Sequence, residues 1–393
     1  MLNIQQAPDS SKPFALFNLA FRAFFLLGPL VAILGLMMWI FHYAGWLLNE
    51  NYWGASTYHS HEMIFGFAVA IIAGFLLTAA RNWTGLAVVS GWKLAGLVLI
   101  WLLGRILPWL SVPGSWVALV DLLFLPLVMI TLAIPVIKVR QWRNIIFIPI
   151  LSLLWLGNLL MHRQQLGLSA MGAHAGLYLG VDVIILLIIV MGGRVIPMFS
   201  GNGIGEKIAR TPQLDRLMIA TGLIYLIAHQ FGFMGWTLAI AALLAFITHS
   251  IRLIIWYRAK IWGVPLVWIL QISYGWIILG FLLMSLAALG YLSPFLALHA
   301  FTVGGISGMI LGMISRVSLG HTGRPLLPPT LVVISFFILQ IAAFVRVIIP
   351  ILLPQMLSAA VIVSGFLWML AFLGFVLSYG KMLVKPRIDG LPG

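Results

Sequence analysis

The chain has 393 residues, of which 63% are hydrophobic and only 8% are charged, and its mean hydropathy is +1.13. A soluble protein of this length could not bury so much apolar surface, whereas repeated apolar runs of about 20 residues are typical of helical membrane proteins. The sequence has no cysteine, which excludes disulfides, thiolate metal ligands and Fe–S clusters. Any bound metal must therefore be held by histidine, methionine, tyrosine or carboxylate side chains.

The apolar runs predict an all-α, polytopic membrane protein whose residues 1–393 form one transmembrane helical domain. We expect about twelve spans. In chain order they cover Phe21 to Trp46, Ser60 to Ala80, Trp92 to Trp109, Ser115 to Ile137, Asn144 to Gln165, Ala173 to Met198, Leu214 to Phe233, Trp236 to Ile255, Val264 to Gly290, Pro294 to Leu319, Thr330 to Ile349 and Gln355 to Lys381.

Lysine and arginine residues gather in alternate loops and at the chain ends. They are Lys12, Arg22, Arg81, Lys93, Lys138, Arg140, Arg143, Lys207, Arg210, Arg216, Arg252, Arg258, Lys260, Arg316, Arg324, Lys381, Lys385 and Arg387. The other loops hold only Arg105, Arg163 and Arg346, each close to a helix end. Since cytoplasmic loops carry the excess of basic residues, both termini are expected to be cytoplasmic. The net charge of +14 is then a signal of topology, and no nucleic-acid partner is expected.

The histidines are unevenly distributed across the predicted membrane. Only His249 and His321 fall on the inner side. The other seven lie at outer helix ends, namely His42, His59, His61, His162, His174, His229 and His299. Buried ionisable groups in a membrane are costly and usually have partners, so this pattern predicts an outer site built from several helices. His42 and His229 have no polar neighbour on their helix face, and we interpret them as residues of the membrane interface.

The string "STYHSHEMIFGF", Ser56 to Phe67, places two histidines and a glutamate at the mouth of a span. His59 and His61 point to opposite sides of a helix, because two residues rotate by about 200°. Either the helix begins at His61 and His59 lies in the loop, or the two serve different centres. We expect both to be metal ligands, together with His174 and His299. "HEMIF" lacks the second histidine of the zinc-protease pattern H-E-x-x-H, which excludes that class.

Acidic and amide side chains accompany these histidines. His174, Tyr178 and Asp182 share one helix face, and Asn158 and His162 share another. Asp121 lies about two turns into the fourth span. A carboxylate that accepts a histidine N–H orients that ring as a metal ligand, so Asp121 and Asp182 could do this, handle protons, or serve as core acids. The candidate catalytic residues are Glu62 and Asp182.

Histidine without cysteine in a helical bundle fits a b-type haem, which only axial side chains hold. The absence of C-x-x-C-H excludes covalent attachment. A stripe of small residues beside His299 (Ala300, Gly304, Gly308 and Gly312) would admit a flat ring or another helix. On the inner side, Arg194, Arg316 and Arg324 could bind haem propionates or Glu206, or fix the topology. His162 and His321 complete the candidate metal ligands.

Three long strings resemble the NnrS family, the multi-span haem–copper membrane proteins of the nitric oxide response. They are "HSHEMIFGFAVAIIAGFLLTAARNWTG", "HAGLYLGVDVIILLIIVMGGRVIPMFS" and "LHAFTVGGISGMILGMISRVSLGHTGRPL". The resemblance implies twelve helices, bound haem and copper, and protection against nitric oxide. It points to His59, His61, Glu62, His162, His174, Arg194, His299, Arg316, His321 and Arg324. Where the family often has a histidine before "GY" in the ninth span, this chain has Gln271, so the number of metal centres can differ here.

We therefore expect a haem b protein of the bacterial inner membrane that relieves nitrosative stress by gas binding or redox chemistry. As an enzyme it would be a haem-dependent oxidoreductase acting on nitric oxide. Its expected partners are membrane lipid, nitric oxide or another small gas, and an electron donor. Two alternatives stay open, a histidine-lined transporter for metal or a small solute and an assembly factor without turnover. The two halves show no clear sequence match, which argues against a repeat-built transporter.

Overall fold

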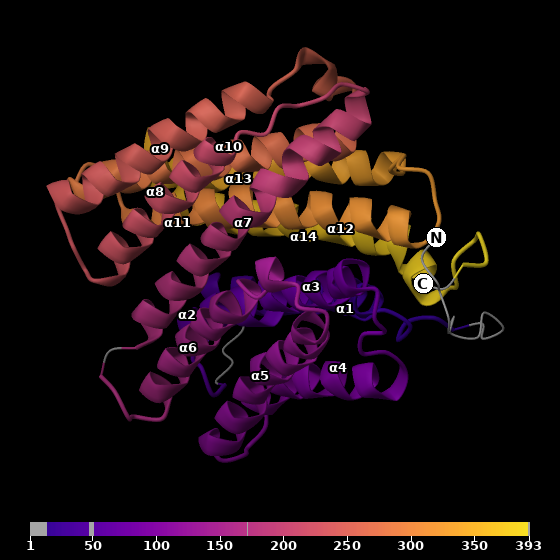
Figure 1. The fold of residues 1–393 in the computed structure, drawn as a ribbon. Coiled ribbons are helices and arrows are strands. Elements are labelled where there is room, and N and C mark those ends of the chain that lie inside the picture. Colours follow the sequence, from indigo (N-terminus) through magenta and orange to yellow (C-terminus); the bar gives the residue numbers. More distant parts are fainter. Residues whose placement is uncertain (1–13, 47–50, 171, 392–393) are drawn as a thin grey trace. The chain divides into compact units, whose positions relative to one another are not determined.

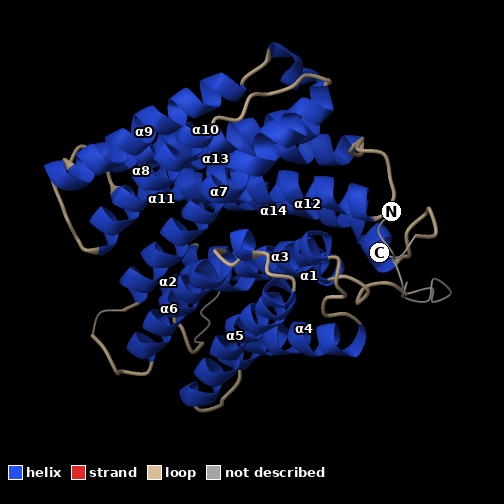
Figure 2. Cartoon of the chain, viewed as in Figure 1, coloured by secondary structure: helices blue, strands red, loops and turns tan. Residues whose placement is uncertain are grey.

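The computed structural model describes residues 14–46, 51–170 and 172–391, and these residues form helices and connecting loops but no strand (Figures 1 and 2). A helix satisfies all the backbone polar groups of its own segment, as a membrane interior demands. Among the described residues, eleven helical segments are long and apolar enough to cross a membrane. The predicted all-α, multi-pass membrane fold is confirmed.

The helices group into two compact units. Unit 1 comprises Met1–Gly180, Val317–Leu326 and Phe375–Gly393, and unit 2 comprises Val181–Arg316 and Leu327–Gly374. Three long helices, α7 (Ala173–Ile204), α12 (Ser307–His321) and α14 (Leu357–Val384), contribute residues to both.

Unit 1 is built mainly from the first five predicted spans and the start of the sixth. Its remaining elements are α1 (Ala20–Tyr43), α2 (Ala55–His61), η1 (Glu62–Ala68), α3 (Val69–Thr84), α4 (Gly91–Ile106), η2 (Leu107–Trp109), α5 (Gly114–Lys138), η3 (Trp142–Asn144) and α6 (Phe147–Gln165). Helix α3 packs against α1 and α5, and α5 packs also against α4 and α6. Aromatic side chains fill the core, where the Trp101 ring lies edge-on to Phe24 with centroids 5.9 Å apart.

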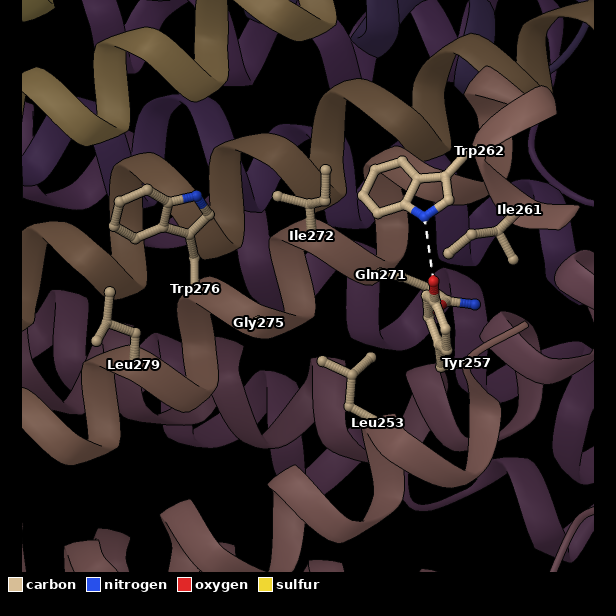
Figure 3. A pocket seen from close by; sticks show the side chains of 9 residues that line it. All are labelled: Leu253, Tyr257, Ile261, Trp262, Gln271, Ile272, Gly275, Trp276 and Leu279. Carbon is tan, nitrogen blue, oxygen red and sulfur yellow. Dashed lines mark hydrogen bonds between the residues drawn. The ribbon is translucent and has the colours of Figure 1, made fainter. Parts of the chain in front are cut away.

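Unit 2 contains the other elements. They are α8 (Pro212–Gln230), α9 (Trp236–Trp256), η4 (Ala259–Gly263), α10 (Pro265–Ala288), α11 (Pro294–His299), η5 (Ala300–Ile306), α13 (Thr330–Leu352) and η6 (Pro354–Met356). Helix α9 packs between α8 and α10, and η5 packs against α10 and α13. An apolar groove of about 340 Å³ runs along α9 and α10 (Figure 3).

Two spans contain a π-helical segment, and each begins directly after a histidine. Segment η1 follows His61 inside the continuous helix Ala55–Thr84, and η5 follows His299 inside Pro294–His321. A π-turn inserts an extra residue into the helix and is frequent at functional sites, because it changes the direction in which neighbouring side chains project. The helix of the second span therefore begins at Ala55, and His59 lies within it rather than in the preceding loop.

The seventh predicted span, Leu214 to Phe233, forms the 19-residue helix α8. It is the one predicted span outside the eleven apolar candidates. Its mean hydropathy is lower than that of the other spans because its first residues include Gln213, Asp215 and Arg216. Asp215 accepts a 2.5 Å bond from Arg252 of α9, so the polar start of α8 is compensated inside unit 2.

Candidate metal centre

Helices α2, α4, α5 and α6, with the first residue of η1, bring six polar side chains together inside unit 1. This buried polar cluster consists of His61, Glu62, Arg105, Asp121, Asn158 and His162, each at most 7% exposed. Charged groups at such a position must be paired with one another or with a ligand, because lipid offers them no hydration.

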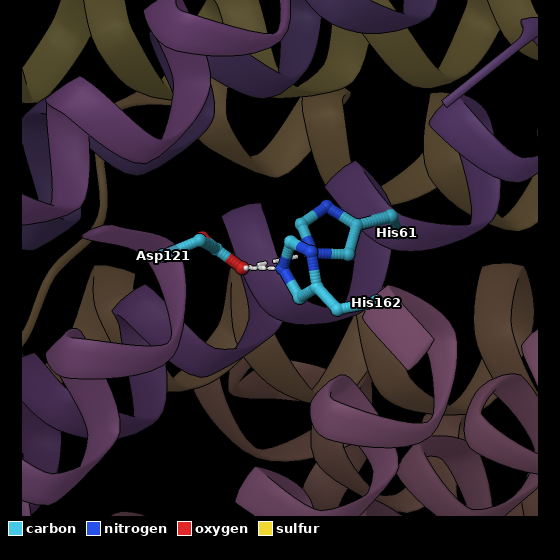
Figure 4. A group of neighbouring side chains, drawn as sticks. All are labelled: His61, Asp121 and His162. Atoms are coloured by element: carbon cyan, nitrogen blue, oxygen red, sulfur yellow. Dashed lines mark hydrogen bonds and ion pairs between the residues drawn. The ribbon is translucent and has the colours of Figure 1, made fainter. Parts of the chain in front are cut away.

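The Asp121 carboxylate points at the rings of both histidines of the cluster (Figure 4). Its Oδ2 atom is 3.1 Å from Nε2 of His61 and 3.1 Å from Nε2 of His162. The same oxygen accepts a 2.7 Å hydrogen bond from the Asn158 amide nitrogen. Its other oxygen, Oδ1, forms an ion pair with the Arg105 guanidinium. One carboxylate thus joins side chains from three other helices.

The ring of His61 faces hydrogen-bond acceptors on both sides. Its Nδ1 is 3.0 Å from Oε1 of Glu62, and its Nε2 is 2.9 Å from Oδ1 of Asn158 as well as near Asp121. The Asn158 orientation is fixed, because its NH₂ group donates to Asp121. The environment is satisfied when an additional proton is bound, on His61 or on Glu62, or when Nδ1–H of His61 donates to Glu62 while Nε2 binds a cation.

The charges of the cluster also indicate that it needs an additional positive charge. Arg105 Nε lies 3.2 Å from Oε2 of Glu62, and Arg105 also pairs with Asp121. With neutral imidazoles, two carboxylates therefore face a single guanidinium and leave one negative charge uncompensated. A buried charge of this kind is costly, so the cluster requires one additional proton or a bound metal cation.

The donor atoms are arranged as a metal ion needs them. One atom each of His61, Asp121 and His162 lies within 4.8 Å of the other two. Metal–ligand bonds of about 2.0–2.1 Å in a tetrahedron place neighbouring ligand atoms roughly 3.3 Å apart. The two histidine-to-Asp121 distances of 3.1 Å are within a few tenths of that value. Two imidazoles and a carboxylate suit copper, zinc or non-haem iron.

Two aromatic residues ahead of α2 hold the histidines in place. The Tyr52 hydroxyl oxygen lies 3.2 Å from Nδ1 of His162, within hydrogen-bond distance. Burial and the nearby Asp121 carboxylate raise the pKa of Tyr52 above its usual value, so the hydroxyl stays neutral and can accept the Nδ1 proton of His162 when Nε2 binds a metal. The Trp53 ring stacks on His61 with centroids 4.0 Å apart and lies 4.5 Å from His162. These contacts fix both ring orientations and cover the cluster with apolar surface.

Two glycines make room for the cluster. A Cβ atom at Gly66 would lie 2.6 Å from Oε2 of Glu62, and one at Gly104 would lie 2.7 Å from Oδ1 of Asp121. Neither carboxylate can move away from such a Cβ atom without a cost in free energy, because both are paired with Arg105. The close approach of α4 to α5 at Gly104 therefore sets the position of the Asp121 carboxylate.

Replacing Gly104 with alanine should displace Asp121 and lower the free energy of unfolding by about 1–3 kcal/mol, the usual cost of overpacking. Gly96 on the same helix is the matched control, because a Cβ there meets no atom within 4 Å. Gly96→Ala should leave stability unchanged or raise it by up to ~1 kcal/mol through helix propensity. Thermal unfolding of both variants followed by circular dichroism tests this, and equal midpoints would contradict it.

The cluster does not fit a haem. An axial imidazole must direct one nitrogen into a flat apolar slot. Here the Nε2 atoms of His61 and His162 both face Asp121, and their ring nitrogens on the other side are occupied by Glu62 and Tyr52. The space bounded by these atoms has the size of a single ion. The described residues of the cluster could thus hold a single metal ion but not a macrocycle.

The other predicted ligands of unit 1 lie elsewhere. His59 projects away from the cluster, and its half-buried ring stacks on Trp39 with centroids 4.1 Å apart. His174 is exposed, and its ring lies 6.1 Å from Tyr178. The His321 ring packs 5.4 Å from Phe21. Arg324, on the loop after α12, donates to a backbone carbonyl two residues earlier at 3.3 Å.

Unit 2 contains the remaining predicted residues. Asp182 accepts bonds from His229 at 2.8 Å and from Gln230 at 2.6 Å. Nδ1 of His299 donates to the Phe295 carbonyl at 2.6 Å, and its Nε2 lies 3.1 Å from the Arg346 guanidinium. A metal at His299 would have to displace that arginine. Arg194 is half-buried on α7, and Arg316 lies over the Phe199 ring at 3.9 Å.

Sequence reasoning missed several partners. Arg105 is one of three arginines predicted on the outer side, where basic residues are rare. Such an arginine is a signal of an acidic partner inside the protein. His229 was interpreted as an isolated interface residue, yet Asp182 from another helix binds it. His249, one of the two inner histidines, hydrogen-bonds Tyr274, which also accepts from Arg252 at 3.3 Å.

Comparison with known proteins agrees with the resemblance noted in the sequence. A search of curated proteins finds no match. The model of one protein family, described as NnrS protein, matches residues 15–387, which include every residue of the buried polar cluster. Because the match covers nearly the whole chain, this multi-pass membrane protein belongs to the NnrS family.

Proposed function

We propose that this chain relieves nitric oxide stress in the bacterial inner membrane through gas binding or redox chemistry at a metal ion held by the buried polar cluster. The observation that carries the proposal is the His61–Asp121–His162 group, whose donor atoms converge in a site with an uncompensated negative charge. Family membership supports the link to nitric oxide. Copper is the metal we expect, because the family resemblance implies it and imidazole and carboxylate ligands suit it.

Each member of the cluster has a distinct role in this proposal. His61, Asp121 and His162 hold the ion, and the Asn158 carbonyl oxygen, 2.9 Å from Nε2 of His61, is close enough to be a further ligand. Glu62 accepts the Nδ1 proton of His61 and so directs Nε2 toward the metal. When bound, a redox-active ion supplies a position for a small gas and a store for one electron.

Surrounding residues tune this centre. Arg105 neutralises one carboxylate and prevents the site from collecting a second cation. Trp53 excludes water from the His61 face. Nitric oxide is small and uncharged and dissolves in the membrane, so a buried centre of this kind needs no aqueous channel for its substrate.

Haem b stays a prediction that rests on the outer histidines of a cysteine-free helical bundle and on the family resemblance. Since the buried cluster is the wrong shape for it, a haem would need the histidines outside the cluster. His59 is the best placed in unit 1, because its ring already lies in an aromatic setting beside Trp39. A haem extraction assay on the purified protein decides this independently of the metal in the cluster.

Nitric oxide decay, followed with an electrode in the presence of a chemical reductant, tests the proposed function. Protein in nanodiscs should consume nitric oxide, and its metal content by mass spectrometry should be about one ion per chain. His162→Ala should lose both the metal and the consumption. His42→Ala, a half-buried histidine of the same unit outside the cluster, should keep both.

Different outcomes separate the alternatives. A metal-loaded protein that neither binds nor consumes nitric oxide contradicts the proposal. Metal accumulation inside liposomes that depends on His162 would instead identify a transporter. Equal nitric oxide consumption by wild type and His162→Ala would show that the chemistry lies outside the buried polar cluster.

A further inference from the structure

Among the described residues of unit 2, Arg316 on α12 is the buried arginine that lacks a hydrogen-bond acceptor. It is 6% exposed, and its guanidinium lies over the Phe199 ring of α7 at 3.9 Å. It forms no hydrogen bond or ion pair with any residue that the structure describes. Arg252, by contrast, pairs with Asp215 at 2.5 Å and donates to the Ile189 carbonyl at 3.2 Å. A buried cation without a partner is costly, so Arg316 is expected to meet an anion that is not part of the chain.

The donor groups of Arg316 remain accessible. Contact with an aromatic ring uses the face of a guanidinium, whereas its N–H groups lie in the plane and point past the ring. The Nε atom of Arg252 is enclosed by protein, but no nitrogen of Arg316 is. The planar fork of N–H groups fits two oxygens of one phosphate or carboxylate group. An oxyanion could therefore bind there without any change in the contact with Phe199.

The acid that the sequence allows as a partner of Arg316 is bound elsewhere. Because consecutive helices cross in alternate directions, the loops 205–211 and 257–264 lie at the same end of unit 2 as this arginine. Together they contain four lysines and arginines but a single acid, Glu206. Glu206 pairs with Nζ of Lys260 at 2.7 Å. This end of unit 2 therefore has an excess of positive charge, which attracts anions from the surroundings.

Arg316 also lies at the depth of lipid head groups. It is five residues from His321, where α12 ends, and Phe199 is five residues from Ile204, where α7 ends, which is about 7–8 Å along each helix. The head-group layer on each side of a bilayer is roughly 5–8 Å thick. Met198, next to Phe199, is 48% exposed, so an adjacent face of α7 borders the lipid.

We propose that Arg316 binds the phosphate of an anionic phospholipid. Two phosphate oxygens accept N–H groups of the guanidinium, and the acyl chains extend along the lipid-facing side of α7. The lipid supplies the negative charge that the described side chains of unit 2 do not supply. Basic sites between transmembrane helices on the cytoplasmic side typically bind such head groups. Binding requires neither the metal of the buried polar cluster nor nitric oxide, so it does not depend on the proposed function.

Thermal unfolding of the full-length protein, stripped of lipid in the neutral detergent dodecyl maltoside, tests the inference. Dioctanoyl phosphatidylglycerol should raise the midpoint with saturation and bind at least about fivefold more tightly than dioctanoyl phosphatidylcholine. Arg316→Gln should weaken phosphatidylglycerol binding by about 10–100-fold, the range of a charge-assisted hydrogen bond. Arg216→Gln, at an exposed arginine of the same unit, is the control and should bind as wild type does.

Two further measurements separate a ligand site from a structural arginine. Without lipid, Arg316→Gln should unfold at or above the wild-type midpoint, because it removes an unpaired buried charge. A lower midpoint would mean that Arg316 stabilises the fold through the chain itself, and would overturn the inference. Arg316→Lys keeps the charge but lacks the planar fork, so it should retain only part of the affinity for phosphatidylglycerol.

Free phosphate and haem propionates carry similar oxygen atoms, and they are distinguished by their own assays. Inorganic phosphate that binds as tightly as phosphatidylglycerol would identify a site for soluble anions and contradict the lipid assignment, as would phosphatidylcholine that binds equally well. Equal phosphatidylglycerol binding by wild type and Arg316→Gln would also overturn it. Loss of haem from Arg316→Gln with unchanged lipid binding would assign this arginine to a propionate instead.

Discussion

Asp121→Asn is expected to abolish metal binding at the buried polar cluster. The substitution keeps the shape of the side chain but removes its charge and directs an NH₂ or a neutral oxygen at two histidine nitrogens that now lie 3.1 Å away. The loss of affinity should exceed the roughly 10–100-fold that removal of an outer hydrogen-bond partner costs, because Asp121 is a ligand itself. Copper titration of the metal-free protein with a competing chelator measures this.

Asp182→Asn provides the matched control for that experiment. Asp182 is also a buried carboxylate that accepts a hydrogen bond from a histidine, but it belongs to unit 2. Its asparagine variant should keep the wild-type affinity for copper. If Asp121→Asn bound copper as tightly as wild type, the cluster would be a proton-balanced polar network and the metal would have to lie elsewhere.

Arg105→Met should be the most destabilising single substitution in the metal-free cluster. Arg105 pairs with both Glu62 and Asp121, and all three side chains are almost completely buried. Its removal leaves two carboxylates without their only arginine, and breaking a buried pair in this way costs about 3–5 kcal/mol. Unfolding of chelator-treated protein in detergent, followed by circular dichroism, should show the loss.

A second substitution distinguishes lost charge from lost packing. Glu62→Gln combined with Arg105→Met removes one carboxylate along with the guanidinium and should recover part of the stability. Arg163→Met, at an exposed arginine of the same unit, should change stability by no more than about 0.5 kcal/mol. A double variant as unstable as Arg105→Met alone would mean that Arg105 acts through packing of its stem and not through its charge.

The helical spans could be predicted from sequence because apolar length is a local property. A run of about 20 apolar residues must be helical in lipid, whatever its neighbours are. The same reasoning located the elements of the candidate site, since His61, Asp121, Asn158 and His162 were all recognised as costly groups in apolar helices. The polar first turn of α8 was visible too, as Asp215 and Arg216, and its weaker apolar character follows directly from them.

The pairing of those groups was decided only by the tertiary structure. His61 meets Asn158 and Asp121 across 97 and 60 residues of sequence, and Arg105 enters the same cluster from α4. Hydropathy does not encode the rotation of a helix about its axis, and the π-turn after His61 changes that rotation further. By itself the sequence determined that this protein crosses the membrane many times and carries costly histidines and acids. The tertiary structure decided which of these histidines and acids form one site, through the close approach of α4 to α5 at Gly104 and the packing of α2 and α6 around Asp121. The physical reason is that the choice of partner depends on contacts between helices that are far apart in the chain.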